Sequence, residues 1–378
     1  MPTRQAPARL RLLSLAAVLG LAGGGCIYAR TVYYGTPRLD APAYFDSRPV
    51  RASPTPKPLP SAAREATFAL TDAERRAHRS FDGLLRDSDT RAFVALRDDR
   101  VIYERYFGGV DASTALPSFS VSKTVAALLI GCAIDDGLIG SVRQPLVDFV
   151  PELSTRPHYA EVTLEHLLRM TSGIDFDEES VAGAFFYYSA NLPTRMYAYD
   201  VKWTPGTHYL YGSISTQILW DVLHRRLGGR TVTEYFEQRV WGPLGADHPA
   251  AWSLDSAESG VEKLFGGFSA TARDHARLGL LFLHGGSVDG RPVVSPSWVA
   301  TSVAPDPIPG VVHTADGWVR RGQYQWFLTL DGRGYYAKGY HGQYVFVVPS
   351  RNMVFVRFGE GYGDVDWVSF FTRLADAA

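Results

Sequence analysis

The stretch of sequence that decides the fold reads Ser118-Phe-Ser-Val-Ser-Lys-Thr-Val-Ala-Ala-Leu-Leu-Ile-Gly-Cys-Ala-Ile-Asp135. It predicts an apolar helix over residues 120–135, ended by Gly137, with Ser120 in its first turn. Lys123 follows Ser120 by three positions, and side chains at that spacing share one face of a helix. The stretch therefore predicts an apolar helix that presents a serine and a lysine together at its N-terminus.

This pair has the chemistry of a nucleophile and its base. Backbone N–H groups and the helix dipole at a helix N-terminus stabilise the negative charge that develops when a serine reacts. A neutral lysine amine beside the serine can take the hydroxyl proton, which arginine cannot do because it stays protonated in proteins. Of the five lysines, Lys123 alone has a serine three positions earlier. The alternative interpretation is a solvated helix N-cap beside an exposed lysine.

Outward from this helix, strand patterns gather toward both ends of the domain. They predict two strands joined by a tight turn at Asp98-Asp99, and three more near the C-terminus, over residues 91–97, 100–107, 324–330, 343–348 and 353–358. Helical patterns lie between and after them, over residues 163–170, 215–226, 274–284 and 365–375. We expect an α/β protein of the α+β type, in which both ends of the domain build a mainly antiparallel sheet flanked by helices and the middle builds a helical lobe. A ligand site is expected in the cleft between the lobes.

Composition excludes several other classes of protein. With 46% hydrophobic and 20% charged residues, the chain of 378 residues can bury a large core and is not expected to be disordered. Its 38 basic and 39 acidic residues nearly cancel, which argues against a nucleic-acid partner held by bulk positive charge. Two cysteines cannot form a disulfide framework, and Cys132, inside the apolar helix, is interpreted as a buried packing residue.

The N-terminal segment has the layout of a bacterial export signal. Three arginines precede an apolar run over residues 12–22, and three glycines lead into Cys26. Residues 1–29 are therefore expected to be a signal peptide or membrane anchor. Lipidation of Cys26 after cleavage, which a resemblance to a lipobox implies, and an uncleaved anchor stay open as equal alternatives, and release of the free protein is less favoured. Each outcome exports the domain to the periplasm or another extracytoplasmic site, and the first two attach it to a membrane.

A proline-rich run follows, with the sequence Ser53-Pro-Thr-Pro-Lys-Pro-Leu-Pro60. Alternating prolines favour an extended polyproline conformation without internal hydrogen bonds. We expect residues 30–61 to form a tether and residues 62–378 to form the folded domain. The alternative is a chain end that happens to be rich in proline.

Two further short motifs stand at the boundaries of predicted elements. Tyr211-Gly-Ser213 precedes the helix predicted over residues 215–226, where a tyrosine can bring its phenol oxygen into a cleft as a proton relay. Taken alone, such a tyrosine is more often a buried structural residue. Gly339-Tyr-His-Gly-Gln343 stands at the head of a predicted strand, where glycines let a substrate lie against the strand edge and a backbone N–H face its carbonyl.

Together and in this order, the three motifs resemble those of the serine β-lactamases, penicillin-binding proteins and related esterases. Two further stretches agree, Val162-Thr-Leu-Glu-His-Leu-Leu-Arg-Met-Thr-Ser-Gly173 and Gly266-Gly-Phe-Ser-Ala-Thr-Ala-Arg273. The resemblance spans about residues 85–375. It is greatest to the class C β-lactamase branch, which includes carboxylesterases and the 6-aminohexanoate-dimer hydrolases.

The resemblance implies a β-lactamase/DD-peptidase-like fold and a role for each motif residue. Ser120 is the implied acylated nucleophile, Lys123 its base and Tyr211 the proton relay. The backbone N–H groups of Ser120 and Gln343 are the implied oxyanion hole. The implied substrate-binding residues around it are Tyr340, His341, Gly342 and Ser213.

Two positions depart from the family pattern. The second motif often ends in asparagine in the lactamases, whereas this chain has Ser213. The third usually begins with lysine, whereas this chain has Tyr340. The acylation chemistry survives both changes, but the neutral hydroxyl of Tyr340 leaves the recognition of a substrate carboxylate in doubt. The aromatic run over residues 185–188 would either wall the cleft or pack in the core, the commoner place for such residues.

Other constellations of catalytic residues are missing from the sequence. It has no Gly-x-Ser-x-Gly elbow and no His-Glu-x-x-His motif, and its ten histidines are scattered without ligand spacing. Neither an α/β-hydrolase nor a metal site is therefore expected, and no cofactor is expected. For His341, contact with the substrate is the less favoured alternative.

We therefore expect an exported serine hydrolase that cleaves a small ester, amide or peptide through a Ser120 acyl-enzyme. The alternatives are a β-lactamase or D-amino-acid peptidase of the same fold, and a catalytically silent protein that binds cell-wall peptides. Retention of Ser120, Lys123 and Tyr211 favours the enzyme, because a binding protein would not need all three.

Overall fold

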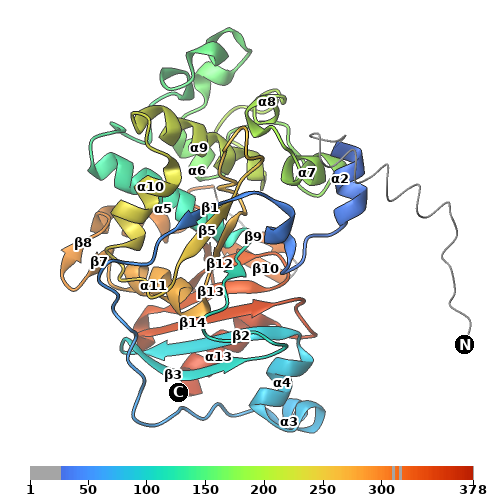
Figure 1. The fold of residues 1–378 in the computed structure, drawn as a ribbon, viewed down its shortest axis with the longest axis vertical. Coiled ribbons are helices and arrows are strands. Elements are labelled where there is room, and N and C mark those ends of the chain that lie inside the picture. The colour runs from blue at the N-terminus through green and yellow to red at the C-terminus, as the bar shows by residue number, and fades with distance from the viewer. Residues whose placement is uncertain (1–26, 309–310, 315–316, 378) are drawn as a thin grey trace, which may run out of the picture.

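The computed structural model describes residues 27–308, 311–314 and 317–377. Residues 1–26, with most of the predicted export signal and Cys26, lie outside the described residues. The described chain has a sheet lobe built from both ends of the domain and a helical lobe built from its middle, as Figure 1 shows. The expected arrangement of an antiparallel sheet flanked by helices is confirmed. Across these described ranges, no helix is both long and apolar enough to cross a membrane.

The main sheet is antiparallel throughout, and its strand order is β3-β2-β14-β13-β12-β11-β10-β9. Because β2 and β3 add directly to β14, the sheet joins the two ends of the domain. Its strands are β2 (Thr90–Arg97), β3 (Arg100–Tyr106), β9 (Val311–Thr314), β10 (Gly317–Arg321), β11 (Phe327–Leu328), β12 (Tyr335–Gly339), β13 (Gln343–Val348) and β14 (Met353–Gly359).

Local sequence explains both the turn between β2 and β3 and the burial of the sheet. Asp98 and Asp99 have φ of 49° and 62°, the positive values that a two-residue hairpin turn requires. Along β14, Met353 and Phe355 enter one hydrophobic core, whereas Val354 between them enters the other. Both faces of the sheet are therefore covered, which accounts for the nearly continuous apolar sequence of its central strands.

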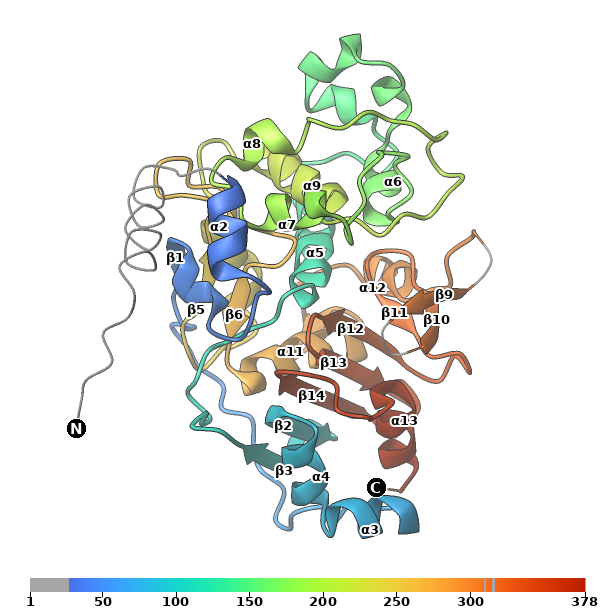
Figure 2. The same cartoon turned by 90° about the vertical axis from the view of Figure 1, so that its right-hand side faces the viewer.

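Helices cover both faces of this sheet, as Figure 2 shows. α11 (Ala272–Leu283) packs on one face, and α13 (Trp367–Ala377) and α4 (Phe81–Asp87) pack on the other. Gly279 brings α11 close to the sheet, because a Cβ at this position would lie 2.6 Å from Val354 Cγ1. Only glycine allows this approach without displacing a strand side chain.

The helical lobe is centred on α5 (Val121–Asp135), the predicted apolar helix. Cys132 is fully buried within it, as expected of a packing residue. α5 packs against α9 (Ser213–Arg226) in its own lobe and against β12 and β13 of the sheet, so it lies between the two lobes. The other helices of this lobe are α6 (Leu164–Leu168), α7 (Val181–Tyr187), α8 (Leu192–Arg195) and α10 (Val232–Phe236).

Residues 30–61 pack on the domain, which differs from the expected tether. β1 (Ser47–Val50) pairs with β5 (Ala250–Ser253) in a second sheet of order β1-β5-β6-β4. Val50 is fully buried there. The local reason is that Ser47-Arg-Pro-Val50 offers an edge strand with one apolar side chain directed into the core. The other strands of this sheet are β6 (Phe268–Ala270) and β4 (Leu116–Pro117).

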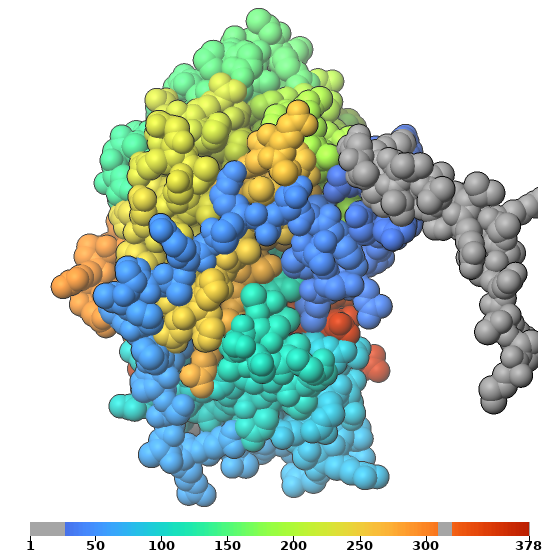
Figure 3. All heavy atoms as spheres, viewed as in Figure 1, coloured from blue at the N-terminus to red at the C-terminus, as the bar shows by residue number. Residues whose placement is uncertain are grey.

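The proline-rich run lies against the domain as well. Residues 53–60 have no helix or strand, in agreement with the prolines. Their backbone is nevertheless bonded to the helical lobe, since the N–H groups of Ser53 and Lys57 donate to the carbonyls of Ala246 and Gly245 at 3.0 and 2.9 Å. Figure 3 shows the N-terminal segment, in blue, lying across both lobes. The folded part of the chain therefore begins before residue 62.

The remaining elements connect these layers. They are the helices α2 (Ile27–Tyr34), α3 (Asp72–His78) and α12 (Pro296–Ser302), the short helices η1 (Ala41–Tyr44), η2 (Leu146–Asp148), η3 (Pro151–Thr155), η4 (Tyr159–Glu161), η5 (Glu237–Trp241) and η6 (Pro349–Arg351), and the paired strands β7 (Ser287–Val288) and β8 (Arg291–Pro292).

One predicted strand is largely replaced in the structure. Residues 324–330 form only the two-residue strand β11, because Gln325 has a φ of 63° that turns the chain. The sequence does not predict β12, since Tyr335-Tyr-Ala-Lys-Gly339 stands between glycines that indicate a loop. β12 contributes Lys338 and Gly339 to the lining of the cleft.

Candidate active site

The N-terminus of α5 is positioned by a strained residue. Phe119 has a φ of 47°, a left-handed conformation that is rare for a bulky side chain. Ser118 before it is fully buried, and its N–H and hydroxyl both donate to the Phe268 carbonyl of β6 at 2.9 Å. This anchored turn leaves Ser120 at the N-cap of α5, where its side chain makes no capping bond and lines the cleft.

Lys123 lies directly beside Ser120. Its Nζ donates hydrogen bonds to Ser120 Oγ and to the Phe265 carbonyl, each at 2.9 Å. The residue is 2% exposed. Burial lowers its pKa to about 8, although the negative charge of Glu178 acts in the opposite direction. The lowered pKa increases the share of Lys123 that is neutral near neutral pH, the form that can accept a proton.

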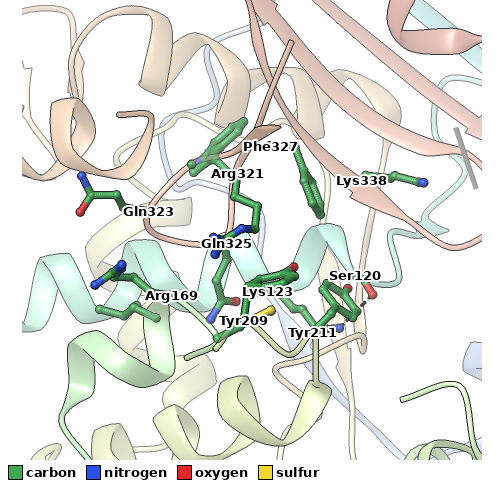
Figure 4. A pocket seen from close by; sticks show the side chains of 14 residues that line it. Ser120, Lys123, Arg169, Tyr209, Tyr211, Arg321, Gln323, Gln325, Phe327 and Lys338 are labelled. Atoms are coloured by element: carbon green, nitrogen blue, oxygen red, sulfur yellow. Dashed lines mark hydrogen bonds between the residues drawn. The ribbon is translucent and has the colours of Figure 1, made fainter. Parts of the chain in front are cut away.

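Tyr211 completes a group of three side chains. Its ring centre lies 5.0 Å from Lys123 Nζ, and its phenol lies close enough to Ser120 for that hydroxyl to act on the phenol pKa. Burial raises the pKa of this phenol, and Glu178 raises it further, so Tyr211 stays protonated at neutral pH. Figure 4 shows the three side chains gathered at one point of the cleft. The first two sequence motifs thus meet in space.

Glu178 is a residue of this site that the sequence does not single out. Its carboxylate accepts hydrogen bonds from the Ser213 N–H, at 2.6 Å, and from the Ser213 hydroxyl. These bonds cap α9, whose N-cap residue Gly212 has no side chain to do so. The hydroxyl of Ser213 reaches the cleft but is already engaged by Glu178. The sequence signal is weak, because four acidic residues within positions 175–179 are typical of any exposed loop.

The third motif is divided between the cleft and the core. Tyr340, in the turn after β12, lines the cleft and is 48% exposed. His341 Nε2 bonds instead to the Pro37 carbonyl at 2.8 Å, and it carries a proton there because a carbonyl can only accept. Gln343 begins β13, is fully buried, and bonds through its side chain to the backbone of Tyr340 and Gly359. Among the described residues, those that line the cleft include neither His341 nor Gln343.

The glycines of this motif serve the backbone. Gly342 has a φ of 77°, and a Cβ there would lie 2.3 Å from Arg357 Nη1, which donates to the Gly342 carbonyl. Gly342 therefore supports the turn, and it is not among the described residues that line the cleft. A Cβ at Gly339 would lie 2.2 Å from the Ser118 carbonyl, so β12 passes directly beside the turn that carries Ser120.

Lys338 is a second cleft residue that sequence reasoning misses. It precedes Gly339 on β12 and lines the cleft, with its Nζ 5.4 Å from the ring centre of Tyr362. The family pattern places Tyr340 where a lysine is usual, but β12 presents a lysine from two residues earlier. No sequence pattern marks Lys338, because β12 itself is not predicted.

The cleft has a volume of about 920 Å³ and is built from three kinds of wall. Asp177, Glu178 and Glu179 form an acidic part. Thr31, Gly35, Thr36 and Pro37 form a second part, from the N-terminal segment. The third is aromatic and includes Tyr187, Tyr188, Tyr209, Phe327 and Tyr340.

The aromatic run over residues 185–188 fulfils both expectations made for it. Tyr187 and Tyr188 line the cleft, whereas Phe186 is buried in the core. Behind Tyr211 a narrower cavity continues between the lobes and is lined by Arg169 and Arg321 (Figure 4). Within the part of the chain that the structure describes, no three His, Cys, Asp or Glu side chains are grouped so that they could hold a metal ion.

Comparison with known proteins identifies the family. Residues 81–368, well over half of the chain, match the β-lactamase family. The chain belongs to the β-lactamase family. Its similarity to the 6-aminohexanoate-dimer hydrolase of Paenarthrobacter ureafaciens agrees, with 31% identity over 308 residues, which are 76% of this chain and 75% of the relative.

Solved structures of other proteins share the fold of this β-lactamase-family chain. A Bacillus anthracis protein assigned as a 6-aminohexanoate-dimer hydrolase superposes with a TM-score of 0.76 at 20% identity, over 88% of this chain and 90% of that one. A family VIII carboxylesterase superposes with a TM-score of 0.62 at 18% identity, over 83% and 98%. The β-lactamase-family protein described here is therefore a serine hydrolase with esterase and amidase relatives.

Proposed function

We propose that this hydrolase cleaves small esters or amides through an acyl-enzyme on Ser120. The observation that carries the proposal is the 2.9 Å contact between Lys123 Nζ and Ser120 Oγ in a buried site, where the lysine pKa falls to about 8. A buried lysine that loses its proton near neutral pH suits a general base. A silent binding protein has no use for it.

In the acylation step, neutral Lys123 takes the proton of Ser120 as Oγ bonds to the substrate carbonyl carbon. Tyr211, whose raised pKa keeps it protonated, gives a proton to the leaving oxygen or nitrogen, and the proton on Lys123 restores it. Water then attacks the acyl-enzyme, and the same two groups take its proton and return one to Ser120 Oγ. The products are a carboxylic acid and an alcohol or amine.

The oxyanion that forms in each step needs backbone donors. The N–H of Ser120, at the N-terminus of α5, is the first. The family resemblance implies Gln343 as the second, but Gln343 is buried on β13, one strand away from the cleft. We therefore assign the second donor to the backbone N–H of Tyr340, which lines the cleft in the turn directly after β12.

The form of the cleft favours a neutral ester as substrate. Its aromatic wall suits an apolar acyl chain, and Tyr340 offers only a neutral hydroxyl where lactamases hold a substrate carboxylate. A β-lactam or D-amino-acid peptide, which carries that carboxylate, is the less favoured substrate.

A second candidate substrate is the 6-aminohexanoate dimer, the amide in the name of the relative from Paenarthrobacter ureafaciens. The acidic wall formed by residues 177–179 would attract the free ammonium group of such a substrate, and Lys338 its carboxylate. If so, Glu179→Gln and Lys338→Met lower kcat/KM at least about tenfold more for the dimer than for p-nitrophenyl butyrate. Equal effects on both substrates would contradict this candidate.

We also propose that the protein is exported and held at a membrane through its N-terminus. The basic, apolar and glycine-rich order of residues 1–26 supports this. Fractionation of cells that express wild type and Cys26→Ala tests it: release of the variant alone into the soluble periplasm supports lipidation, and retention of both supports an uncleaved anchor. Recovery of the wild type in the cytoplasm would contradict export.

A fluorophosphonate probe tests the proposed nucleophile. The probe should label wild type on the peptide that contains Ser120 and should not label Ser120→Ala. Ser122→Ala is the matched control, because Ser122 lies two residues away on α5 and its hydroxyl accepts from the Phe268 N–H inside the core. Labelling of Ser120→Ala at any other serine, with undiminished hydrolysis, would overturn the proposal.

A further inference from the structure

The first described residues of the chain form part of the substrate cleft. Thr31, Gly35, Thr36 and Pro37 line it together with Ser120. Figures 1 and 2 both place α2 beside α7 of the helical lobe, and the two helices pack together. Residues that the sequence predicts to be part of a tether therefore lie beside Ser120 in the cleft.

Two hydrogen bonds fasten this segment, one to each lobe. From the helical lobe, the Tyr188 hydroxyl donates to the Gly35 carbonyl at 2.7 Å. From the sheet lobe, His341 Nε2 donates to the Pro37 carbonyl at 2.8 Å. Residues 35–37 thus bridge the two lobes at the edge of the cleft.

Aromatic contacts hold α2 against the lobe. Tyr34 stacks with Tyr188 and Tyr44, with ring centres 5.7 and 4.4 Å apart. Tyr28 meets Phe185 edge-on at 4.7 Å. These contacts are specific in geometry, which distinguishes the segment from a free tether.

α2 has one face toward the cleft and another toward solvent. Thr31 lines the cleft, and its hydroxyl is buried without a hydrogen-bond partner among the described residues. Val32, the next residue, is 84% exposed. A buried, unpartnered hydroxyl in a cleft that Tyr187 and Tyr188 also line marks this wall as a surface for a ligand with an apolar chain and a polar group.

We propose that Thr31, Gly35, Thr36 and Pro37 form the wall against which the acyl group of the substrate packs, and that this wall sets the preferred acyl length. The inference rests on the proposed hydrolysis at Ser120. An acyl chain that extends from Ser120 gains contact with Thr31 and Tyr188 as it lengthens, whereas an acetyl group gains little. The segment is therefore a specificity element for the reaction.

The full-length chain with Thr31→Trp tests this wall, and Val32→Trp is the matched control on the neighbouring face of α2. The measurement is the ratio of kcat/KM for p-nitrophenyl octanoate to that for p-nitrophenyl acetate. The ratio should fall at least about tenfold in Thr31→Trp and stay within about twofold of wild type in Val32→Trp, because methylene contacts are lost only on the cleft face. Tyr188→Phe, which removes one fastening bond, should lower the ratio by about threefold.

A second measurement does not need turnover. Octanoate, a product of the longer ester, should raise the melting temperature of wild type and Val32→Trp but not of Thr31→Trp. Equal ester ratios and equal octanoate shifts in the two tryptophan variants, both folded by circular dichroism, would overturn the inference. Failure of wild type to hydrolyse either ester would instead contradict the proposed function, and the octanoate shifts would still decide whether the wall binds an acyl chain.

Discussion

Lys123 is buried beside Ser120, and this burial is the residue-scale feature on which the proposed chemistry depends. Lys123 is surrounded by the rings of Tyr211 and Phe265, and desolvation outweighs the charge of Glu178 in determining its pKa. The same burial keeps the Tyr211 phenol protonated. One environment therefore lowers the pKa of Lys123 and raises that of Tyr211, which supports the proposed roles of base and proton donor.

The pH dependence of the reaction should follow this lysine. Because its pKa is lowered from 10.5 to about 8, the neutral form increases as pH rises, so kcat/KM should climb through about pH 8 and level off above it. Lys123→Arg and Lys123→Ala should both lose activity by about 10³-fold or more, since arginine keeps the charge but cannot act as a base. Near-native activity in Lys123→Arg would show that the role of the residue is electrostatic.

Glu178 should shift that pH profile. Its charge raises the pKa of Lys123, so Glu178→Gln should move the acid limb of kcat/KM to lower pH. Glu179→Gln is the control, because the neighbouring residue also lines the cleft but is not bonded to Ser213. A profile that moves equally in both variants would contradict a specific role for Glu178.

Among the elements, β1 joins a segment before residue 62 to the folded domain. Val50 is fully buried in the pairing of β1 with β5. Val50→Ala should therefore lower the free energy of unfolding by about 1–3 kcal/mol, through lost transfer free energy and a cavity. Pro54→Ala, at an exposed position of the same segment, should change it by less than about 0.5 kcal/mol. Urea unfolding measures both, and equal small effects would restore the tether interpretation.

At the scale of the whole molecule, the two lobes and the N-terminal segment together line the cleft in which we propose that the substrate binds. The cleft between them has an aromatic wall, and a neutral tyrosine stands where lactamases carry lysine. We expect kcat/KM for p-nitrophenyl butyrate to exceed that for a cephalosporin, because a missing charge-assisted hydrogen bond costs about 1.5–3 kcal/mol. A hundredfold preference for the cephalosporin on the same preparation would restore the lactamase interpretation and assign the carboxylate to Lys338.

Local signals in the sequence determine much of this protein. Helical periodicity predicts α5, alternation and turn residues predict β2, β3, β13 and β14, and the i, i+3 spacing pairs Ser120 with Lys123, because each of these depends on neighbours a few residues apart. The motif order predicts the family.

Other features depend on contacts between residues far apart in the chain, and only the tertiary structure shows them. Gln325 interrupts a predicted strand, and β12 forms because β13 offers it a partner, so Lys338 enters the cleft and Gln343 is buried. The N-terminal segment becomes a wall because the carbonyls of Gly35 and Pro37 meet donors more than 150 residues away in the chain. Strand pairing and long-range hydrogen bonds depend on partners brought together by folding, and no local pattern in the sequence carries that information.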